Sequence, residues 1–198
     1  MTPETLLTRM LPAVPDLLPL VDTPPHQSYL RSYREFVRHA QTLKPIDEGA
    51  VILVAGMVYS WMPRTLRLGG PTDLAAAAEI LESARRKSRL TAKAFEGLST
   101  ALGGSPVASS KALHFFYPEL YPIWDSRVWR ALDWHSSEVR ANAGARYVDY
   151  ADLIGRAAEP ADFMPIHAQV EQKVGYPVSR IRALELLLFL SGAIDHEE

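Results

Sequence analysis

The chain has 198 residues and a formal charge of -2, and 47% of its residues are hydrophobic and 22% charged. A chain of this length and composition can bury a complete core, which excludes a largely disordered protein and predicts one compact domain over residues 1–198, or two closely packed helical lobes. The absence of cysteine from the sequence excludes a disulfide framework, a cysteine nucleophile and a thiolate site for zinc or an iron-sulfur cluster, and it is consistent with a cytoplasmic location.

The N-terminal segment, residues 1–22, has no basic leader, and Pro12, Pro15 and Pro19 interrupt its apolar positions. This pattern is poor for a secretory signal peptide, so we expect the segment to belong to the mature protein. The longest apolar run, residues 50–59, is about half as long as the roughly 20 residues that a helix needs to cross a bilayer. We therefore expect no membrane span.

Helical periodicity runs through nearly the whole chain, and alternating strand patterns are hard to find, so the sequence predicts an all-α fold. The first helix with clear boundaries begins after the cap residue Asp47 and runs to about Trp61 through a segment that is apolar on all sides. It ends before Pro63. A second helix, rich in alanine, follows the Gly69–Asp73 turn and covers Leu74 to Arg86.

Thr91 caps the next predicted helix, which stops at Gly103 and Gly104. Ser105 as the cap and Pro106 at the first helical position then start another helix, so two helices meet across a short hairpin. Later helices are predicted at residues 125–134, 146–157, 161–174 and 178–191. The last of these is nearly apolar on every side, as a buried closing helix would be.

A basic cluster follows the alanine-rich helix and consists of Arg85, Arg86, Lys87, Arg89 and Lys93. The overall charge of the chain provides no general attraction to nucleic acid, so any contact with phosphates needs a local patch of this kind. The alternative is a solvated helix end whose cations complement the negative pole of the helix dipole.

Aromatic residues concentrate between Phe115 and Trp134, a segment that holds three of the four tryptophans. Such a segment can line a pocket in which a flat ring stacks, and Trp124 is then the candidate substrate-binding residue. The alternative is that these side chains simply form core at helix junctions.

Asp125 stands directly after this proline- and aromatic-rich stretch and before the apolar start of a helix. There it can act as an N-cap that accepts a hydrogen bond from the backbone N–H of Arg127 or Val128, a contact that contributes roughly 1 kcal/mol. A carboxylate at the mouth of a helix can also stabilise a developing cation or position a nucleophile. The two roles are compatible.

The order of a hairpin, a helix and then a Pro-Ile-x-Asp-x-x-Val element at residues 122–128 resembles the helix-hairpin-helix DNA glycosylase superfamily, over residues 91–135. The resemblance implies a fold like that of 8-oxoguanine glycosylases, double-stranded DNA with a damaged base as partner and a role in DNA repair. Without cysteine the chain cannot carry the iron-sulfur cluster of some relatives, so we expect no cofactor. It assigns Asp125 as the catalytic carboxylate, which stabilises positive charge on the deoxyribose while the glycosidic bond breaks.

The same resemblance implies a nucleophile position in the helix after the hairpin. Aligning Val107 and Ala112 with the family's valine and alanine puts Ser110 at that position, and a shift of one residue puts Lys111 there. A lysine would attack the sugar C1′ and form a Schiff base, which adds strand nicking to base release, whereas a serine would leave only hydrolysis by an activated water. Both alternatives stay open in the sequence.

Contacts to the DNA backbone are also implied by the resemblance. The hairpin at Ser105, Val107 and Ala108 takes the place of the segment whose backbone N–H groups hold a phosphate. The basic cluster, with Arg86, Lys87, Arg89 and Lys93, would supply further backbone contacts.

Histidines offer one further candidate and no metal site. His114 follows Lys111 by three positions and therefore lies on the same helix face, where it could share a substrate pocket and move protons. The alternative is an ordinary structural histidine. No histidine spacing closes a metal site, so we predict no bound metal.

The competing hypothesis for the whole chain comes from a different class of protein. It is a non-catalytic helical module that binds a protein partner or a small ligand, in which Asp125 is only a cap and the aromatic segment is only core.

Overall fold

The computed structural model describes the chain except for residues 63, 87–89, 136, 138–140 and 195–198. The described residues form helices, turns and loops without any strand, which confirms the predicted all-α fold. The α-helices are α1 (Pro3–Met10), α2 (Val14–Leu17), α3 (Pro24–Ala40), α4 (Glu48–Ser60), α5 (Pro71–Ala84), α6 (Ala92–Ala101), α7 (Pro106–Phe116), α8 (Ser126–Ala131), α10 (Ala143–Ala157), α11 (Met164–Val174) and α12 (Arg180–Ile194). Short 3-10 turns, η1 (Leu11–Ala13), η2 (Leu18–Asp22) and η4 (Ala161–Phe163), join some of them.

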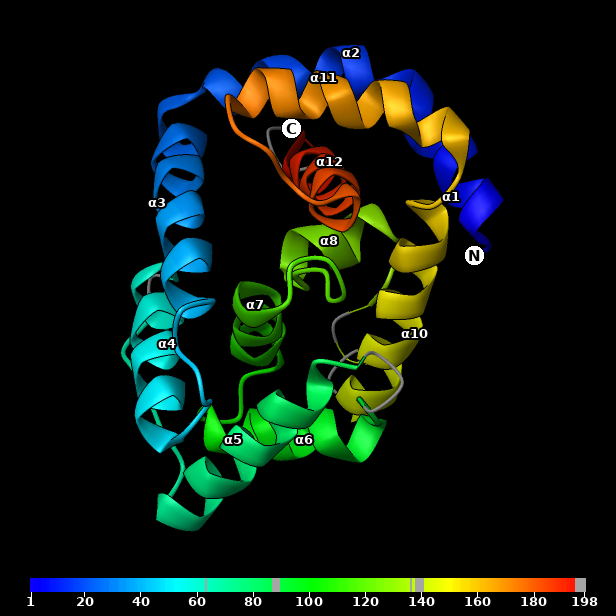
Figure 1. The fold of residues 1–198 in the computed structure, drawn as a ribbon. Helices are drawn as coiled ribbons and strands as arrows, with labels where there is room; N and C mark the ends of the chain where they lie inside the picture. The colour runs from blue at the N-terminus through cyan, green and yellow to red at the C-terminus, as the bar shows by residue number, and fades with distance from the viewer. Residues whose placement is uncertain (63, 87–89, 136, 138–140, 195–198) are drawn as a thin grey trace.

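The helices are arranged as a frame around a central group. In Figure 1, α7, α8 and α12 occupy the middle, with α3 and α4 on one side, α10 on the other, α5 and α6 at one end and α2 and α11 at the opposite end. Helix α12 packs on α8, and α6 packs on both α5 and α10. Apolar side chains from α1 through α12 belong to one continuous buried cluster.

The N-terminal segment forms short helices rather than an irregular leader. Pro12, Pro15 and Pro19, which interrupt the apolar pattern in the sequence, each lie in the first turn of η1, α2 or η2. A proline is tolerated there because the first N–H groups of a helix have no intrahelical partner. The segment then continues into the long helix α3, which was not predicted although Thr23 and Pro24 stand at its start as N-cap and first helical residue.

Three helix starts lie where their cap residues predict them, whereas the alanine-rich helix α5 begins at Pro71, three residues before the predicted Leu74, with Gly70 as its N-cap. Asp47 accepts a hydrogen bond from Ala50 N at 2.8 Å, and Thr91 and Ser105 each accept one at 3.2 Å from the N–H three residues ahead. Helix α8 is shorter than predicted and ends at Ala131, because Asp133 adopts a left-handed φ of 58° that a continuing helix does not allow.

The hairpin between α6 and α7 depends on its two glycines. Gly103 and Gly104 have φ values of 69° and 73°, which glycine adopts without steric cost. A Cβ on Gly103 would lie 2.6 Å from the Cβ of Arg67 and 2.9 Å from the hydroxyl of Tyr59. The same hydroxyl donates a hydrogen bond to the carbonyl of Leu102 at 2.9 Å, so the hairpin is held against the end of α4.

The aromatic segment is largely core. Trp124 is fully buried against the rings of Tyr147 and Tyr150. The hydroxyls of these two tyrosines donate hydrogen bonds to the carbonyls of Pro122 and Ile123, at 3.0 Å and 2.9 Å. The two hydrogen-bonded tyrosine hydroxyls and the buried rings hold the extended backbone before α8 in one position. That position determines where Asp125 lies.

Candidate active site

A cavity of about 990 Å³ lies among the central helices and the α3–α4 side of the frame. Its wall comes from α3, the end of α4 and the segment after it, the α6–α7 hairpin, α7, α8 and α12. Its volume is at the upper end of the range of pockets that hold small molecules, about 300–1,000 Å³. Lys111 and Asp125 both line it, so residues from two helices meet at one hollow.

Lys111 projects from α7 into this cavity and is only 6% exposed. Its Nζ lies 4.9 Å from the centre of the Trp61 ring, and within the described chain it forms no ion pair with a carboxylate. Burial lowers the pKa of Lys111, an effect that the charges of Asp125 and Glu185 oppose in part. A lowered pKa increases the fraction of neutral amine at a given pH, and the neutral amine is the nucleophilic form.

Asp125 has the two roles that its position in the sequence makes compatible. Its Oδ1 accepts hydrogen bonds from the backbone N–H of Arg127 at 3.0 Å and of Val128 at 3.2 Å, which confirms the predicted N-cap of α8. The residue also lines the cavity. The cap therefore holds a carboxylate in a defined place beside the space that faces Lys111.

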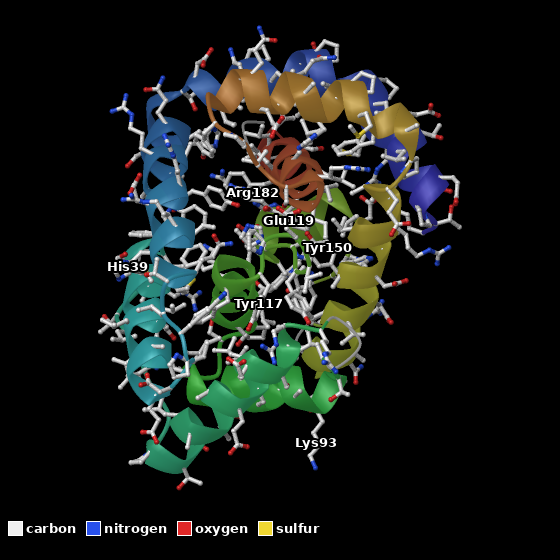
Figure 2. The ribbon with its side chains drawn as sticks, in the orientation of Figure 1. His39, Lys93, Tyr117, Glu119, Tyr150 and Arg182 are labelled. Atoms are coloured by element: carbon white, nitrogen blue, oxygen red, sulfur yellow. The ribbon has the colours of Figure 1, made fainter. Side chains whose placement is uncertain are left out.

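Two further charged residues of the cavity come from α12 and were missed in the sequence. Arg182 and Glu185 are 5% and 1% exposed, form a hydrogen-bonded ion pair and line the cavity. The Arg182 guanidinium lies 4.5 Å from the centre of the Tyr33 ring, and Figure 2 shows Arg182 inside the frame of helices. The sequence did contain a signal for this pair, an Arg and a Glu three positions apart in a largely apolar helix. Charged residues are almost never fully buried unless they are paired, so this spacing could have indicated a buried ion pair.

The pKa of Glu185 is raised above the usual range of a carboxylic acid. Burial raises its pKa to about 7, although the charge of Arg182 acts in the opposite direction and that of Asp125 adds to the increase. Around neutral pH this carboxyl group can therefore either hold or release a proton, which is the property of a general acid or base.

Three of the predicted site residues lie in the core and do not line the cavity. The Ser110 hydroxyl donates to the carbonyl of Val107 at 2.9 Å and accepts from the N–H of Trp124 at 3.0 Å. His114 is fully buried, and burial lowers its pKa to about 3. The structure thus brings Lys111, not Ser110, to the cavity, and neither His114 nor Trp124 is placed against a ligand in it.

His114 has a structural environment. Its Nδ1 lies 2.6 Å from the carbonyl of Tyr121, and its Nε2 lies 2.8 Å from the hydroxyl of Tyr33. A neutral imidazole that donates from Nδ1 and accepts at Nε2 satisfies both contacts. This arrangement corrects the expectation that His114 shares the pocket of Lys111.

The predicted DNA-backbone residues divide between the cavity and the outer surface. Ser105 and Val107 line the cavity, while Ala108 is buried behind them. Arg86 and Lys93 are exposed and do not line the cavity, and Figure 2 shows Lys93 pointing outward beyond α6. Lys87 and Arg89 lie outside the described residues.

The cations that do line the cavity are scattered along the sequence, which is why sequence patterns did not reveal them. Besides Lys111 and Arg182, they are Arg64 and Arg67 after α4 and Arg127 on α8. The guanidinium of Arg127 lies 4.6 Å from the centre of the Phe189 ring, and its NH1 is 3.3 Å from Nε2 of His26. These arginines supply a local positive potential that the net charge of the chain does not.

Comparison of the chain with protein-family models, with curated proteins and with solved structures found no match. Within the described residues, no group of three His, Asp or Glu side chains is arranged to hold a metal ion. In the same part of the chain, no helix has both the length and the apolar character that crossing a membrane requires.

Proposed function

We propose that this protein binds duplex DNA, takes a damaged nucleotide into the cavity and releases its base, with Asp125 as the catalytic carboxylate and Lys111 as the nucleophile. The observation that carries the proposal is that Lys111 and Asp125 line the same cavity although they come from different helices. The resemblance of residues 91–135 to helix-hairpin-helix DNA glycosylases supports the choice of reaction.

The chemistry of the two groups is complementary. The neutral amine of Lys111 attacks the sugar C1′, the glycosidic bond breaks, and its electron pair leaves with the base, which takes up a proton. Asp125 stabilises the positive charge that develops on the sugar. The rings of Trp61 and Trp129, which also line the cavity, offer surfaces on which a base can stack.

Binding of DNA in this proposal depends on groups at the cavity rather than on the exposed basic cluster. Arg67 lies beside the hairpin at Gly103, and Arg64 lines the same cavity, so phosphates on either side of an extruded nucleotide can meet them. A cavity of this size also suits the competing function, a non-catalytic module that binds a small ligand. The two functions differ in whether a base is released.

Substitution of Asp125 separates its two roles. Because asparagine caps a helix as well as aspartate does, we expect Asp125→Asn to change the free energy of unfolding by less than about 0.5 kcal/mol, whereas Asp125→Ala costs about 1 kcal/mol. Both variants should lower base release by about 100-fold or more, since the negative charge is lost. Urea unfolding and chromatography of bases released from duplexes with oxidised, deaminated or alkylated bases provide the two measurements.

Asp47→Asn is the matched control, because Asp47 caps α4 in the same way and does not line the cavity. Its base release should equal that of the wild type. If the wild-type protein released no base from any of these duplexes and showed no salt-sensitive DNA binding, the catalytic proposal would be wrong and the ligand-binding module would be favoured.

The salt dependence of DNA binding tests which cations meet the phosphates. For the double variant Arg64→Ala/Arg67→Ala, we expect the slope of log Kd against log salt to fall by about 2, since each lost phosphate contact removes about 0.9. Arg86→Ala/Lys93→Ala removes the same charge from the exposed cluster and should leave the slope unchanged. Fluorescence anisotropy with a labelled duplex between about 50 and 200 mM salt measures both. The opposite pattern would assign DNA binding to the exposed cluster.

A further inference from the structure

The carboxylate of Glu185 is only half satisfied. Its Oε2 accepts a hydrogen bond from Arg182, but its Oε1 is buried and has no hydrogen-bond partner among the described residues. A buried acceptor without a partner is costly, so proteins keep one where it has a function or where a ligand, water or proton completes it. The pairing with Arg182 explains one oxygen of Glu185 and leaves the other unexplained.

The same cavity also contains a buried amine that lacks a hydrogen-bond acceptor among the described residues. Lys111 is a buried amine without an ion-pair partner in the described chain. A second cation, Arg182, also lies over the Trp61 ring, with its guanidinium 6.0 Å from the ring centre. Lys111, Arg182, Asp125 and Glu185 all line this cavity, and their charges sum to zero when all four are ionised. The cavity therefore holds an amine that lacks an acceptor and a carboxylate oxygen that lacks a donor.

We propose that Glu185 is the proton-exchange partner of Lys111 and thereby determines the pH at which Lys111 becomes a free amine. In the exchange, one Nζ–H bond breaks, the proton binds Oε1 of Glu185 directly or through one water, and Nζ keeps the electron pair. The total charge of the cavity does not change. The inference rests on the proposed function for the reaction that the amine performs, but the exchange itself requires no DNA.

The pKa values of Lys111 and Glu185 are shifted towards each other. Burial lowers the pKa of Lys111 and raises the pKa of Glu185 to about 7, because loss of contact with solvent disfavours both charged forms. When two groups interact this strongly, their protons leave in macroscopic steps that belong to the pair. The neutral pair, an amine and a carboxylic acid, thus lies close in free energy to the ion pair.

The groups around the pair include Asp125, whose charge acts on both members, and His26, which lines the same cavity. Arg182 stays a guanidinium because arginine is not deprotonated in proteins. Burial raises the pKa of each tyrosine near the pair and lowers that of His114, so these side chains stay neutral. The tyrosines are Tyr33, Tyr147, Tyr150 and Tyr176.

The test measures the reactivity of Lys111 without DNA. The protein is treated with formaldehyde and cyanoborohydride from about pH 5 to about pH 10, and methylation of Lys111 is quantified by peptide mass spectrometry. We expect the wild-type profile to have two steps. For Glu185→Gln we expect one step, with a midpoint about one pH unit below that of the later wild-type step. The reason is that an ionised Glu185 stabilises the ammonium form of Lys111, whereas the uncharged amide does not.

Two variants serve as controls. Glu185→Asp keeps the charge and should restore part of the wild-type profile, which a merely structural role of Glu185 would not explain. Glu79→Gln removes an equal charge from an exposed residue of α5 that does not line the cavity, and its profile should match the wild type. An unchanged midpoint in Glu185→Gln would overturn the proposal.

A measurement on the wild-type protein decides the question even if the glutamine variant does not fold. The carbon-13 resonance of Cε in Lys111, assigned by its loss in Lys111→Met, should show a titration step near pH 7, where Glu185 exchanges its proton. A single step at an ordinary lysine pKa, about 10.4, would overturn the proposal. Failure of the proposed function is distinguishable, because absent base release together with a two-step titration contradicts the enzyme assignment and leaves the proton exchange intact.

Discussion

Replacement of Lys111 by alanine is expected to abolish the covalent adduct that borohydride traps between the protein and a duplex with a damaged base, and to abolish strand nicking. Reduction by borohydride requires a Schiff base, which forms only from a primary amine that has attacked the sugar. Because Lys111 is the lysine that lines the cavity among the described residues, the trapped yield should fall below about one hundredth of the wild-type value. Denaturing electrophoresis of end-labelled DNA measures the adduct and the nicked strand together.

Two variants make this result specific. Ser110→Ala should keep the adduct, because the Ser110 hydroxyl is hydrogen-bonded to backbone atoms and does not line the cavity. Lys93→Ala removes an exposed amine and should also keep it. An adduct that persisted in Lys111→Ala would mean that another amine reacts. Base release by the wild type without any trapped adduct would instead indicate hydrolysis by water, the outcome that the serine alignment predicts.

The largest loss of stability from a small change is expected at Gly192. This glycine lies where α12 crosses α8, and a Cβ added to it would be 2.0 Å from the carbonyl oxygen of Arg127 and 2.7 Å from its carbonyl carbon. Backbone atoms cannot rotate away as a flexible side chain can, so the two helices must move apart. We expect Gly192→Ala to reduce the free energy of unfolding by about 3 kcal/mol. Urea denaturation with a constant m-value measures the change.

The displacement should also reach the active site. Helix α8 carries Asp125 at its N-terminus and α12 carries Glu185, so a wider spacing changes the distance between the carboxylates and Lys111. Base release by Gly192→Ala should therefore fall even under conditions in which the variant is fully folded.

Gly56→Ala is the matched control, since Gly56 also lies within a helix but has no atom within 4 Å of an added Cβ. There alanine should stabilise the protein by up to about 1 kcal/mol, because it favours the helix more than glycine does. A loss below about 1 kcal/mol for Gly192→Ala would contradict the close packing of α12 on α8.

Helix boundaries and caps were predictable because they depend on contacts within a few residues. The caps Asp47, Thr91, Ser105 and Asp125 each accept a hydrogen bond from an N–H two or three positions ahead, so the local sequence contains both partners. The break after α6 was predictable for the same reason, since a left-handed φ strongly favours glycine. These contacts do not depend on the rest of the fold.

The composition of the cavity was not predictable in the same way. Neighbouring residues on a helix point about 100° apart, so Ser110 and Lys111 face different surroundings, and a one-residue uncertainty in alignment changes which of them is in the site. The burial of Arg182 and Glu185 in the cavity wall and the approach of Arg67 to the hairpin require elements far apart in the chain to pack together.

The sequence by itself therefore determined the all-α fold and the helix starts that Asp47, Thr91, Ser105 and Asp125 cap, because short-range hydrogen bonds and apolar periodicity specify them. Only the tertiary structure decided that Lys111 and Asp125 share a cavity with Arg182 and Glu185, while Ser110, His114 and Trp124 lie in the core. The physical reason is that the position of a residue in its helix determines the direction of its side chain. The residues that this side chain contacts depend on how helices distant in the sequence pack together.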